Sequence, residues 1–239
     1  LSYARNAGVA AARGELLAFT DDDVEVDRRW LVSLLEAFER FDADCVYGKI
    51  LPRWLGPKPP WLGPQLTCNL ALLDHGEQPF VVSSEAHRFF GANVAVRKAA
   101  LIAVGTFNEQ LGRRGNGLGS GEDTDLFFRL RAQGRRIVYQ PEATVTHTVP
   151  TERLTRGYFR RWHLADGRTW AQALSVNGAR SVCGIPLWTV REFLVVAGRF
   201  AGSLCAGGPQ ARMANEVRLF YYLGFCGERM RMWWRRATH

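Results

Sequence analysis

The chain has 239 residues, of which 47% are hydrophobic and 23% are charged, a balance that excludes a disordered or fibrous protein and allows a sizeable core. Its five cysteines are widely spaced and form no C-x-x-C pair, so we expect no disulfide framework or zinc site, and a reducing cytosol. No run of 18 uncharged apolar residues and no charged-then-apolar leader occurs, so we expect neither a membrane-spanning helix nor a signal segment.

The net charge of +8 comes from the last third of the chain. Residues 1–150 carry 17 basic and 18 acidic side chains, whereas residues 151–239 carry 14 arginines and 5 acidic side chains. This asymmetry predicts an anionic partner for the last third, either a phosphate-bearing substrate, a membrane surface or nucleic acid. No nucleic-acid-binding motif is present, so we rank nucleic acid last and expect no such partner.

Predicted helices and strands alternate along the first part of the chain, which is typical of an α/β fold. In chain order we predict a helix at 1–14, a strand at 16–19, a helix at 28–41, a strand at 45–48 and a proline-rich excursion at 52–64. A strand at 89–96, a helix at 98–104, a mobile glycine-rich loop at 112–121, a helix at 122–133 and strands at 136–139 and 144–147 follow. Beyond residue 151 the pattern is helical and basic, with apolar or amphipathic segments at 187–205 and 211–225.

Three consecutive carboxylates, Asp21, Asp22 and Asp23, directly follow the apolar run at 16–19. They bring negative charge to the carboxyl end of a predicted strand, the edge at which open α/β sheets bind ligands. Because like charges repel, the cluster needs either a cation or a solvated turn. The alternative is a polar turn in which Asp27 caps the next helix, and spacing alone does not choose between the two.

Four short motifs follow one another along the chain: Ala4-Arg5-Asn6-x-Gly8, Phe19-Thr20-Asp21-Asp22-Asp23, Gly91-Ala92-Asn93 and Gly121-Glu122-Asp123-x-Asp125. Their order and spacing, over about residues 1–165, resemble family 2 glycosyltransferases, which have the GT-A fold. The resemblance implies a metal-dependent, inverting transfer of a sugar from a nucleotide-diphosphate sugar to a glycan or lipid-linked acceptor hydroxyl. It implies Mg²⁺ or Mn²⁺ as cofactor and a role in surface polysaccharide or glycoconjugate assembly.

The resemblance also implies a metal site made of Asp21, Asp23 and His147. Asp21-x-Asp23 matches the D-x-D motif, in which Asp23 would bind the cation and Asp21 the donor ribose or a metal-bound water. His147 follows where many members have a further ligand, although a lone histidine is more often structural. Asp22 is expected to point away, because adjacent strand residues face opposite sides.

Asp123 matches the catalytic base of the family, and Glu122 beside it would raise the pKa of that carboxyl or orient the acceptor. The alternative for both, and the preferred account of Asp125, is that acidic side chains complement the dipole at a helix amino terminus.

Further donor and acceptor contacts are implied by the same match. Arg5, with Asn6, would approach the donor base or phosphates, and Gly91, Ala92 and Asn93 would line the acceptor side, although core packing explains that segment equally well. Arg161 would contact the donor pyrophosphate from an incomplete Gln-x-x-Arg-Trp motif, in which Tyr158 replaces the glutamine. That departure argues against a processive polymer synthase.

Residues 1–165 are therefore predicted to form a partial GT-A-like catalytic domain, a Rossmann-related mixed sheet flanked by helices. Family members have a strand and an aspartate-bearing turn ahead of the first motif, so we expect this domain to be amino-terminally truncated by roughly two βα units. Residues 166–239 are predicted to form a basic, amphipathic helical extension.

Aromatic residues alternate with arginines at 229–236, a composition that suits a lipid headgroup interface. We expect a cytoplasmic protein that is peripheral at the inner face of the membrane; alternatively these helices pack on the catalytic domain or form a homodimer. Two other functions stay open, a nucleotidyltransferase-like enzyme and an inactive truncated remnant acting as an interaction module.

Overall fold

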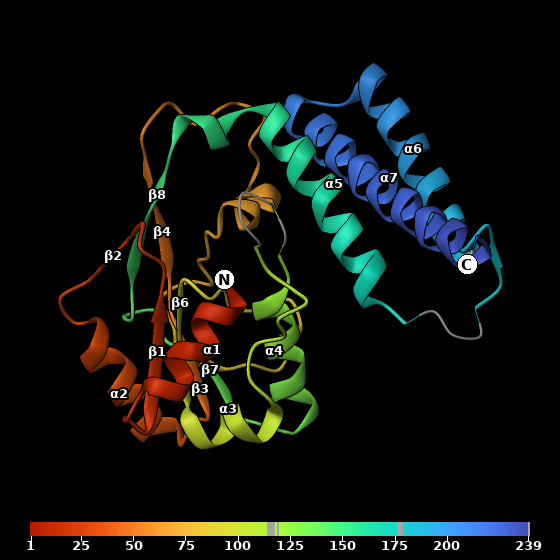
Figure 1. Cartoon of the computed structure of the whole chain (residues 1–239). Helices are drawn as coiled ribbons and strands as arrows, with labels where there is room; N and C mark the ends of the chain where they lie inside the picture. Colours follow the sequence, from red (N-terminus) through yellow and green to blue (C-terminus); the bar gives the residue numbers. More distant parts are fainter. Residues whose placement is uncertain (114–117, 119, 176–178, 239) are drawn as a thin grey trace. The chain divides into compact units, whose positions relative to one another are not determined.

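The structure is a computed structural model that describes residues 1–113, 118, 120–175 and 179–238. The chain divides into two compact units. Unit 1 comprises Leu1–Leu55, Leu70–Glu109 and Glu122–Pro150, and unit 2 comprises Gly56–Asn69, Gln110–Gly121 and Thr151–His239. Unit 1 holds the two larger sheets, and unit 2 holds the three long carboxyl-terminal helices (Figure 1).

Unit 1 is built on a mixed five-stranded sheet with the strand order β1-β6-β3-β7-β5. Its strands are β1 (Leu16–Thr20), β3 (Cys45–Tyr47), β5 (Phe80–Val81), β6 (Asn93–Arg97) and β7 (Ile137–Tyr139). Strand β6 runs antiparallel to β1 and β3, whereas β3 and β7 are parallel. Every residue of β3 and β7 is buried, as expected for short apolar runs covered on both faces.

A second, three-stranded sheet has the order β2-β8-β4, with β2 (Val24–Val26), β4 (Ile50–Trp54) and β8 (Val145–Val149). Strand β8 is antiparallel to β2 and parallel to β4. The sequence did not predict β2, and the prediction that the proline-rich excursion includes 52–54 was wrong. Pro52 is compatible with β4 because this strand lies at a sheet edge, where a missing N–H costs no ladder bond.

The two sheets are joined where β3 continues into β4 and β7 continues into β8. At the first junction a side chain on Gly48 would overlap the carbonyl group of Ala143, at the second junction. The fully buried side-chain amide of Asn93 donates to the carbonyl oxygens of Lys49 (2.8 Å) and Ala143 (2.7 Å). Its Oδ1 accepts a hydrogen bond from the Trp30 indole (2.8 Å), so one amide ties both junctions to a helix.

Four helices flank these strands, namely α1 (Ser2–Ala11), α2 (Trp30–Phe41), α3 (Lys98–Val104) and α4 (Glu122–Ala132) (Figure 1). Helix α2 buries Trp30, Leu34 and Phe38 from its predicted apolar face, whereas Leu31 and Leu35 are exposed. Asp27 accepts a hydrogen bond from the Arg29 backbone N–H (2.8 Å), but the cap residue of α2 is Arg29, so Asp27 is not the cap that the alternative interpretation required.

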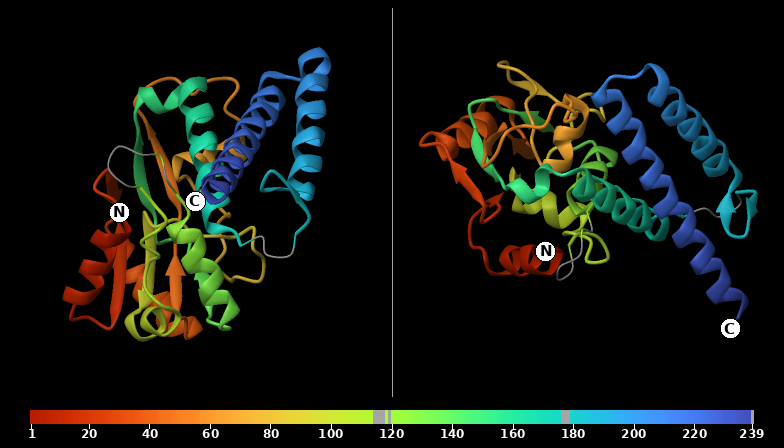
Figure 2. Two further views of the ribbon diagram at one scale, coloured as in Figure 1. Left: turned by 45° about the vertical axis from the view of Figure 1, so that its right-hand side comes forward. Right: turned by 90° about the horizontal axis from the view of Figure 1, so that it is seen from above.

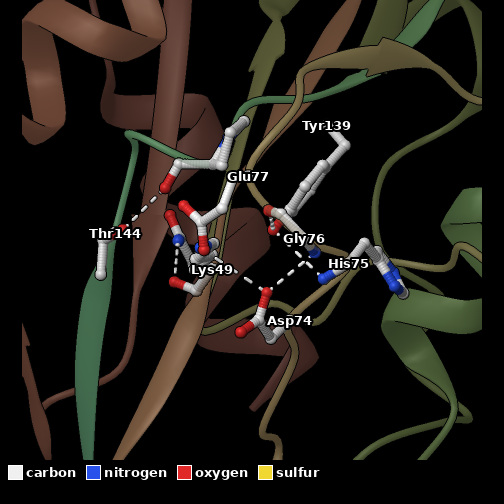
Figure 3. A network of polar contacts seen from close by, with 9 residues as sticks. Lys49, Asp74, His75, Gly76, Glu77, Tyr139 and Thr144 are labelled. Atoms are coloured by element: carbon white, nitrogen blue, oxygen red, sulfur yellow. Dashed lines mark hydrogen bonds and ion pairs between the residues drawn. The ribbon is translucent and has the colours of Figure 1, made fainter.

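A polar network on unit 1 fastens residues 74–77 to the sheet (Figure 3). The buried Lys49 forms ion pairs with Asp74 (3.7 Å) and with Glu77. The Tyr139 hydroxyl donates to the carbonyl oxygen of Gly76 (3.1 Å). A buried ammonium is costly unless it is paired, so these two carboxylates explain how a lysine is accommodated beside the strand junction.

Unit 2 contains the 3₁₀ turn Thr151–Leu154, α5 (Arg156–Ala173), the hairpin β9 (Ser181–Val182) and β10 (Ile185–Pro186), α6 (Leu187–Ala206) and α7 (Pro209–Ala237). Helix α7 packs against both α5 and α6 (Figures 1 and 2). A Cβ on Gly167 would overlap the Tyr221 carbonyl, and one on Gly224 would overlap the Leu164 carbonyl. These two glycines therefore allow the backbones of α5 and α7 to touch.

The expected fold class, α/β with mixed sheets flanked by helices, is confirmed. The helical segments at 187–205 and 211–225 are also confirmed, although α7 continues to Ala237. The domain boundary at 165/166 falls inside α5 and stays a prediction. Part of the predicted mobile loop, 114–117 and 119, lies outside the described residues. No helix within the described ranges is long and apolar enough to span a membrane.

Candidate active site

Arg5 connects three of the four sequence motifs in unit 1. From α1 its guanidinium reaches Asp21 Oδ1 at the end of β1 (3.1 Å) and Glu122 Oε1 at the start of α4 (3.0 Å). It also lies over the ring of Phe107, 5.3 Å from the centroid. Side chains separated from Arg5 by 16 and 117 residues in sequence thus meet on this one arginine, whose side chain is 9% exposed.

Gly91 contributes space and a hydrogen-bond donor to the same place. A Cβ at this position would lie 2.6 Å from Arg5 Cζ, so any side chain would displace the guanidinium. The Gly91 N–H donates to Asp123 Oδ2 (3.2 Å), and the Thr124 N–H donates to Asp123 Oδ1 (2.7 Å). The predicted base therefore has a defined orientation before any substrate binds.

The adjacent carboxyl groups of Glu122 and Asp123 both titrate above their usual range. Burial raises the pKa of Asp123, opposed by the Gly91 hydrogen bond and by the charge of Arg5. Burial, followed by the charge of Asp123, raises the pKa of Glu122, and Arg5 opposes this shift too. A raised pKa makes a carboxylate a better proton acceptor, provided that it is ionised at the working pH.

Two of the predicted metal ligands lie together at the second sheet. His147 pairs with Val24 in the β2–β8 ladder, and its Nε2 lies 3.3 Å from Asp23 Oδ2. The His147 side chain is only 3% exposed, and its Nδ1 has no hydrogen-bond partner among the described residues. A carboxylate oxygen and an imidazole nitrogen in contact fit the donor set of a cation such as Mn²⁺.

The third predicted ligand does not join this pair. Asp21 is held by Arg5, and across the described ranges no three His, Cys, Asp or Glu side chains are grouped closely enough to hold a metal ion. Asp22, between the two, is exposed, which agrees with the expectation that it points away. The roles of Asp21 at the ribose or the metal therefore stay predictions.

Other candidate residues make structural contacts. The Asn6 side chain accepts from the Phe107 N–H (2.9 Å) and donates to the Phe107 carbonyl (2.9 Å) and Glu109 (3.1 Å), which fixes the segment after α3. Ala92 and Asn93 are buried in the core. Arg161 is exposed on α5, in unit 2. The donor contacts of Asn6 and Arg161 and the acceptor contacts of Gly91, Ala92 and Asn93 stay predictions.

Asp125 lies in the first turn of α4, as the preferred helix-dipole account expects, and it also makes structural contacts. It forms an i,i+4 ion pair with Arg129 (2.8 Å), and Arg129 also donates to the carbonyl oxygens of Val104 (2.7 Å) and Thr106 (2.9 Å). Sequence reasoning missed Phe107, which packs edge-on against Phe19 at 5.2 Å and supports Arg5. No motif or periodicity in the sequence marks Phe107.

Comparison with known proteins agrees with these motifs. Residues 1–105 match the family model described as Glycosyl transferase family 2. Over this stretch, which is less than half of its length, the chain is similar to that family. It is 29% identical over 190 residues to the succinoglycan biosynthesis protein ExoM of Rhizobium meliloti (strain 1021), covering 78% of this chain and 58% of that protein.

A second relative is the glucosyl-dolichyl phosphate glucuronosyltransferase of Haloferax volcanii, which is 25% identical over 149 residues, with 62% of this chain and 47% of that protein covered. The chain thus spans about half the length of the curated relatives that it matches. Among solved structures, a mannosyltransferase of Pyrobaculum calidifontis in complex with GDP-Man and Mn²⁺ aligns with a TM-score of 0.49 at 16% identity, covering 100% of this chain and 65% of that one.

Proposed function

We propose that this chain is a family 2 glycosyltransferase that moves a sugar, with inversion, from a nucleotide-diphosphate sugar to a hydroxyl of a glycan or lipid-linked acceptor. The single observation that carries the proposal is the bridge of Arg5 between Asp21 and Glu122. This bridge brings the end of β1 to the start of α4, where Asp123 stands. The names of the two relatives support a role in polysaccharide or glycoconjugate assembly.

In the proposed reaction Asp123 takes the proton of the acceptor hydroxyl. An electron pair of the acceptor oxygen then forms a bond to the anomeric carbon of the donor sugar. At the same time the bond from that carbon to the diphosphate oxygen breaks. The bonding electrons leave with the nucleotide diphosphate, and attack opposite the leaving group inverts the configuration. The raised pKa of the Asp123 carboxyl favours proton uptake, and the Gly91 N–H keeps that carboxylate in one orientation.

Asp23 and His147 are the residues that would hold a divalent cation. When bound, Mg²⁺ or Mn²⁺ supplies positive charge that offsets the charge developing on the diphosphate. Arg5 holds Asp21 and Glu122 in fixed positions, and its charge helps to keep Glu122 and Asp123 ionised. Asp21, fixed in this way, would contact the donor.

The test is an assay of donor hydrolysis and sugar transfer with the purified chain in Mn²⁺, across a panel of nucleotide sugars. Asp123→Asn removes the base and should lower the transfer rate by about 10²–10⁴-fold. Asp23→Ala should abolish Mn²⁺-dependent donor binding, measured by calorimetry, without unfolding the chain. Asp22→Asn is the matched control, because Asp22 is exposed beside the site, and it should keep its rate.

Near-normal turnover of both Asp123→Asn and Asp23→Ala would contradict the site assignment. A folded chain that binds and turns over no nucleotide sugar in the panel would contradict the enzymatic function and favour an interaction module.

A further inference from the structure

One side of α7 exposes apolar side chains in helical register. Leu223, Met230 and Trp234 are all exposed, and Trp234 is 64% accessible. Their spacing of seven and four residues puts them on the same side of the helix. Trp233 is exposed next to this stripe. A helix that only packed within the protein would bury such a stripe, so it needs another environment.

The start of α6 adds to this apolar surface. Leu187, Trp188 and Leu194 are exposed, Leu194 by 63%. The ring of Trp188 lies 6.0 Å from that of Phe225, so this part of α6 lies beside the same half of α7 (Figure 1). The exposed apolar surface therefore extends over two neighbouring helices of unit 2.

The acidic and basic side chains of α7 differ in their exposure to solvent. Its two acidic residues are buried, with Glu216 accepting from Arg160 Nε (2.7 Å) and Glu228 accepting from Gln172 Nε2 (2.8 Å). Arg231 is exposed but also forms an ion pair with Glu228 (3.6 Å), whereas Arg235 and Arg236 are exposed at the end of the helix beside Trp234. The acidic side chains of α7 are thus buried in the helical unit, and the exposed side of this part of the helix carries arginine and apolar side chains.

We propose that the outer face of α7 (Leu223, Met230, Trp233, Trp234, Arg235 and Arg236), with the exposed start of α6, docks on an anionic lipid surface. Tryptophan favours the headgroup level of a bilayer, the apolar stripe can enter the acyl boundary, and arginine pairs with lipid phosphate. A symmetric second copy fits less well, because it would bring the arginines of both copies together. Nucleic acid would match the arginines but leave the apolar stripe uncovered.

This proposal depends only on unit 2 and not on the transferase activity. The test is cosedimentation of the full chain with vesicles of phosphatidylcholine alone and with 30% phosphatidylglycerol. Binding should require the anionic lipid and should weaken sharply in 0.5 M salt. Arg235→Gln/Arg236→Gln should weaken binding roughly fivefold per arginine, and Trp234→Ser about tenfold or more.

Matched controls come from unit 1. Ile102→Ser removes an exposed apolar side chain from α3, and Arg28→Gln/Arg29→Gln removes two exposed arginines, and both should bind vesicles like the unmodified chain. Circular dichroism confirms that every variant is folded.

Three results would overturn the proposal. The first is absence of vesicle binding at low salt. The second is equal weakening of binding by the unit 1 controls, which would indicate general electrostatic adsorption. The third is a stable dimer, detected by analytical ultracentrifugation without lipid, that Trp234→Ser dissociates, because a second copy would then cover this face.

Discussion

The bridging arginine of unit 1 and the last arginines of unit 2 differ in their surroundings. In unit 1, the Arg5 side chain is only 9% exposed, and both of its carboxylate partners come from distant parts of the sequence. In unit 2 the buried Glu216 and Glu228 also pair with arginines, Arg160 and Arg231, but Arg235 and Arg236 are exposed at the end of α7. A buried charge with defined partners fixes geometry, as catalysis requires, whereas exposed charges supply attraction without a fixed geometry. Unit 1 should therefore respond sharply to single changes, and unit 2 gradually.

The largest effect is expected at Asn93, which holds the strand junctions of unit 1. Asn93→Ala leaves the Trp30 indole and the carbonyls of Lys49 and Ala143 without their buried partner, which should cost about 3 kcal/mol or more. Chemical denaturation measures the loss. If the variant keeps its stability but shows a raised KM for the acceptor, the residue acts in acceptor binding, as the sequence suggested.

The second-largest loss of stability is expected for Arg5→Gln. It leaves Asp21 and Glu122 partly buried without their shared cation, at a cost of about 2 kcal/mol after allowance for the partial exposure of Asp21. Thermal unfolding measures this loss of stability, and Arg13→Gln, which removes an exposed arginine just beyond α1, is the control. Equal stability of the two variants would mean that the buried bridge contributes no more than a surface charge.

In unit 2, a large loss of stability from a single substitution is expected only where α5 and α7 are in contact. Gly224→Ala forces a Cβ against the Leu164 carbonyl and should destabilise the unit by about 1–2 kcal/mol. Gly227→Ala, three residues later on the same helix, has open space around it and should stabilise by up to about 1 kcal/mol. The same sign for both variants, in thermal unfolding, would contradict the close approach of the two helices.

The smallest effect concerns the pH dependence of transfer. Because burial raises the pKa of Asp123, kcat/KM should fall with decreasing pH through a value above about 3.9, the ordinary value for aspartate. Arg5 opposes this shift, so Arg5→Gln should move the acid limb to higher pH. An acid limb that does not move in Arg5→Gln would show that Asp123 is not the titrating base.

The same shift has a defined sign for stability. A folded state with a raised carboxyl pKa binds the proton more tightly than the unfolded chain does. The contribution of Asp123 to the free energy of unfolding is therefore greatest below the unfolded pKa and declines as the pH rises through the folded pKa.

Local sequence patterns were enough to predict β1, α3, α4 and the helices of unit 2, because their signals are runs and periodicities within a dozen residues. The order of the four motifs predicted that Asp21, Glu122 and Asp123 belong to one site. Strand β2 was missed because Val24-Glu25-Val26 is short and largely exposed, and only its pairing with β8 makes it a strand. The role of Arg5 as a bridge between carboxylates depends on contacts over 117 residues, which no local pattern encodes.

The sequence marks Asn93 only as part of the short motif Gly91-Ala92-Asn93 and does not predict its hydrogen bonds. Two of its partners are backbone carbonyls, which carry no sequence signature, and they lie 44 and 50 residues away.

The amide of Asn93 also has a consequence for motion. It holds the chain at Lys49 and at Ala143, the two points where strands pass from the sheet near Asp123 to the sheet that carries His147. Hinge bending between these sheets would have to break both hydrogen bonds in a dry environment, and Gly48 leaves no clearance for sliding. Asp123 and His147 should thus keep a constant separation. In hydrogen exchange, the Val145 amide at this junction should be among the slowest of unit 1.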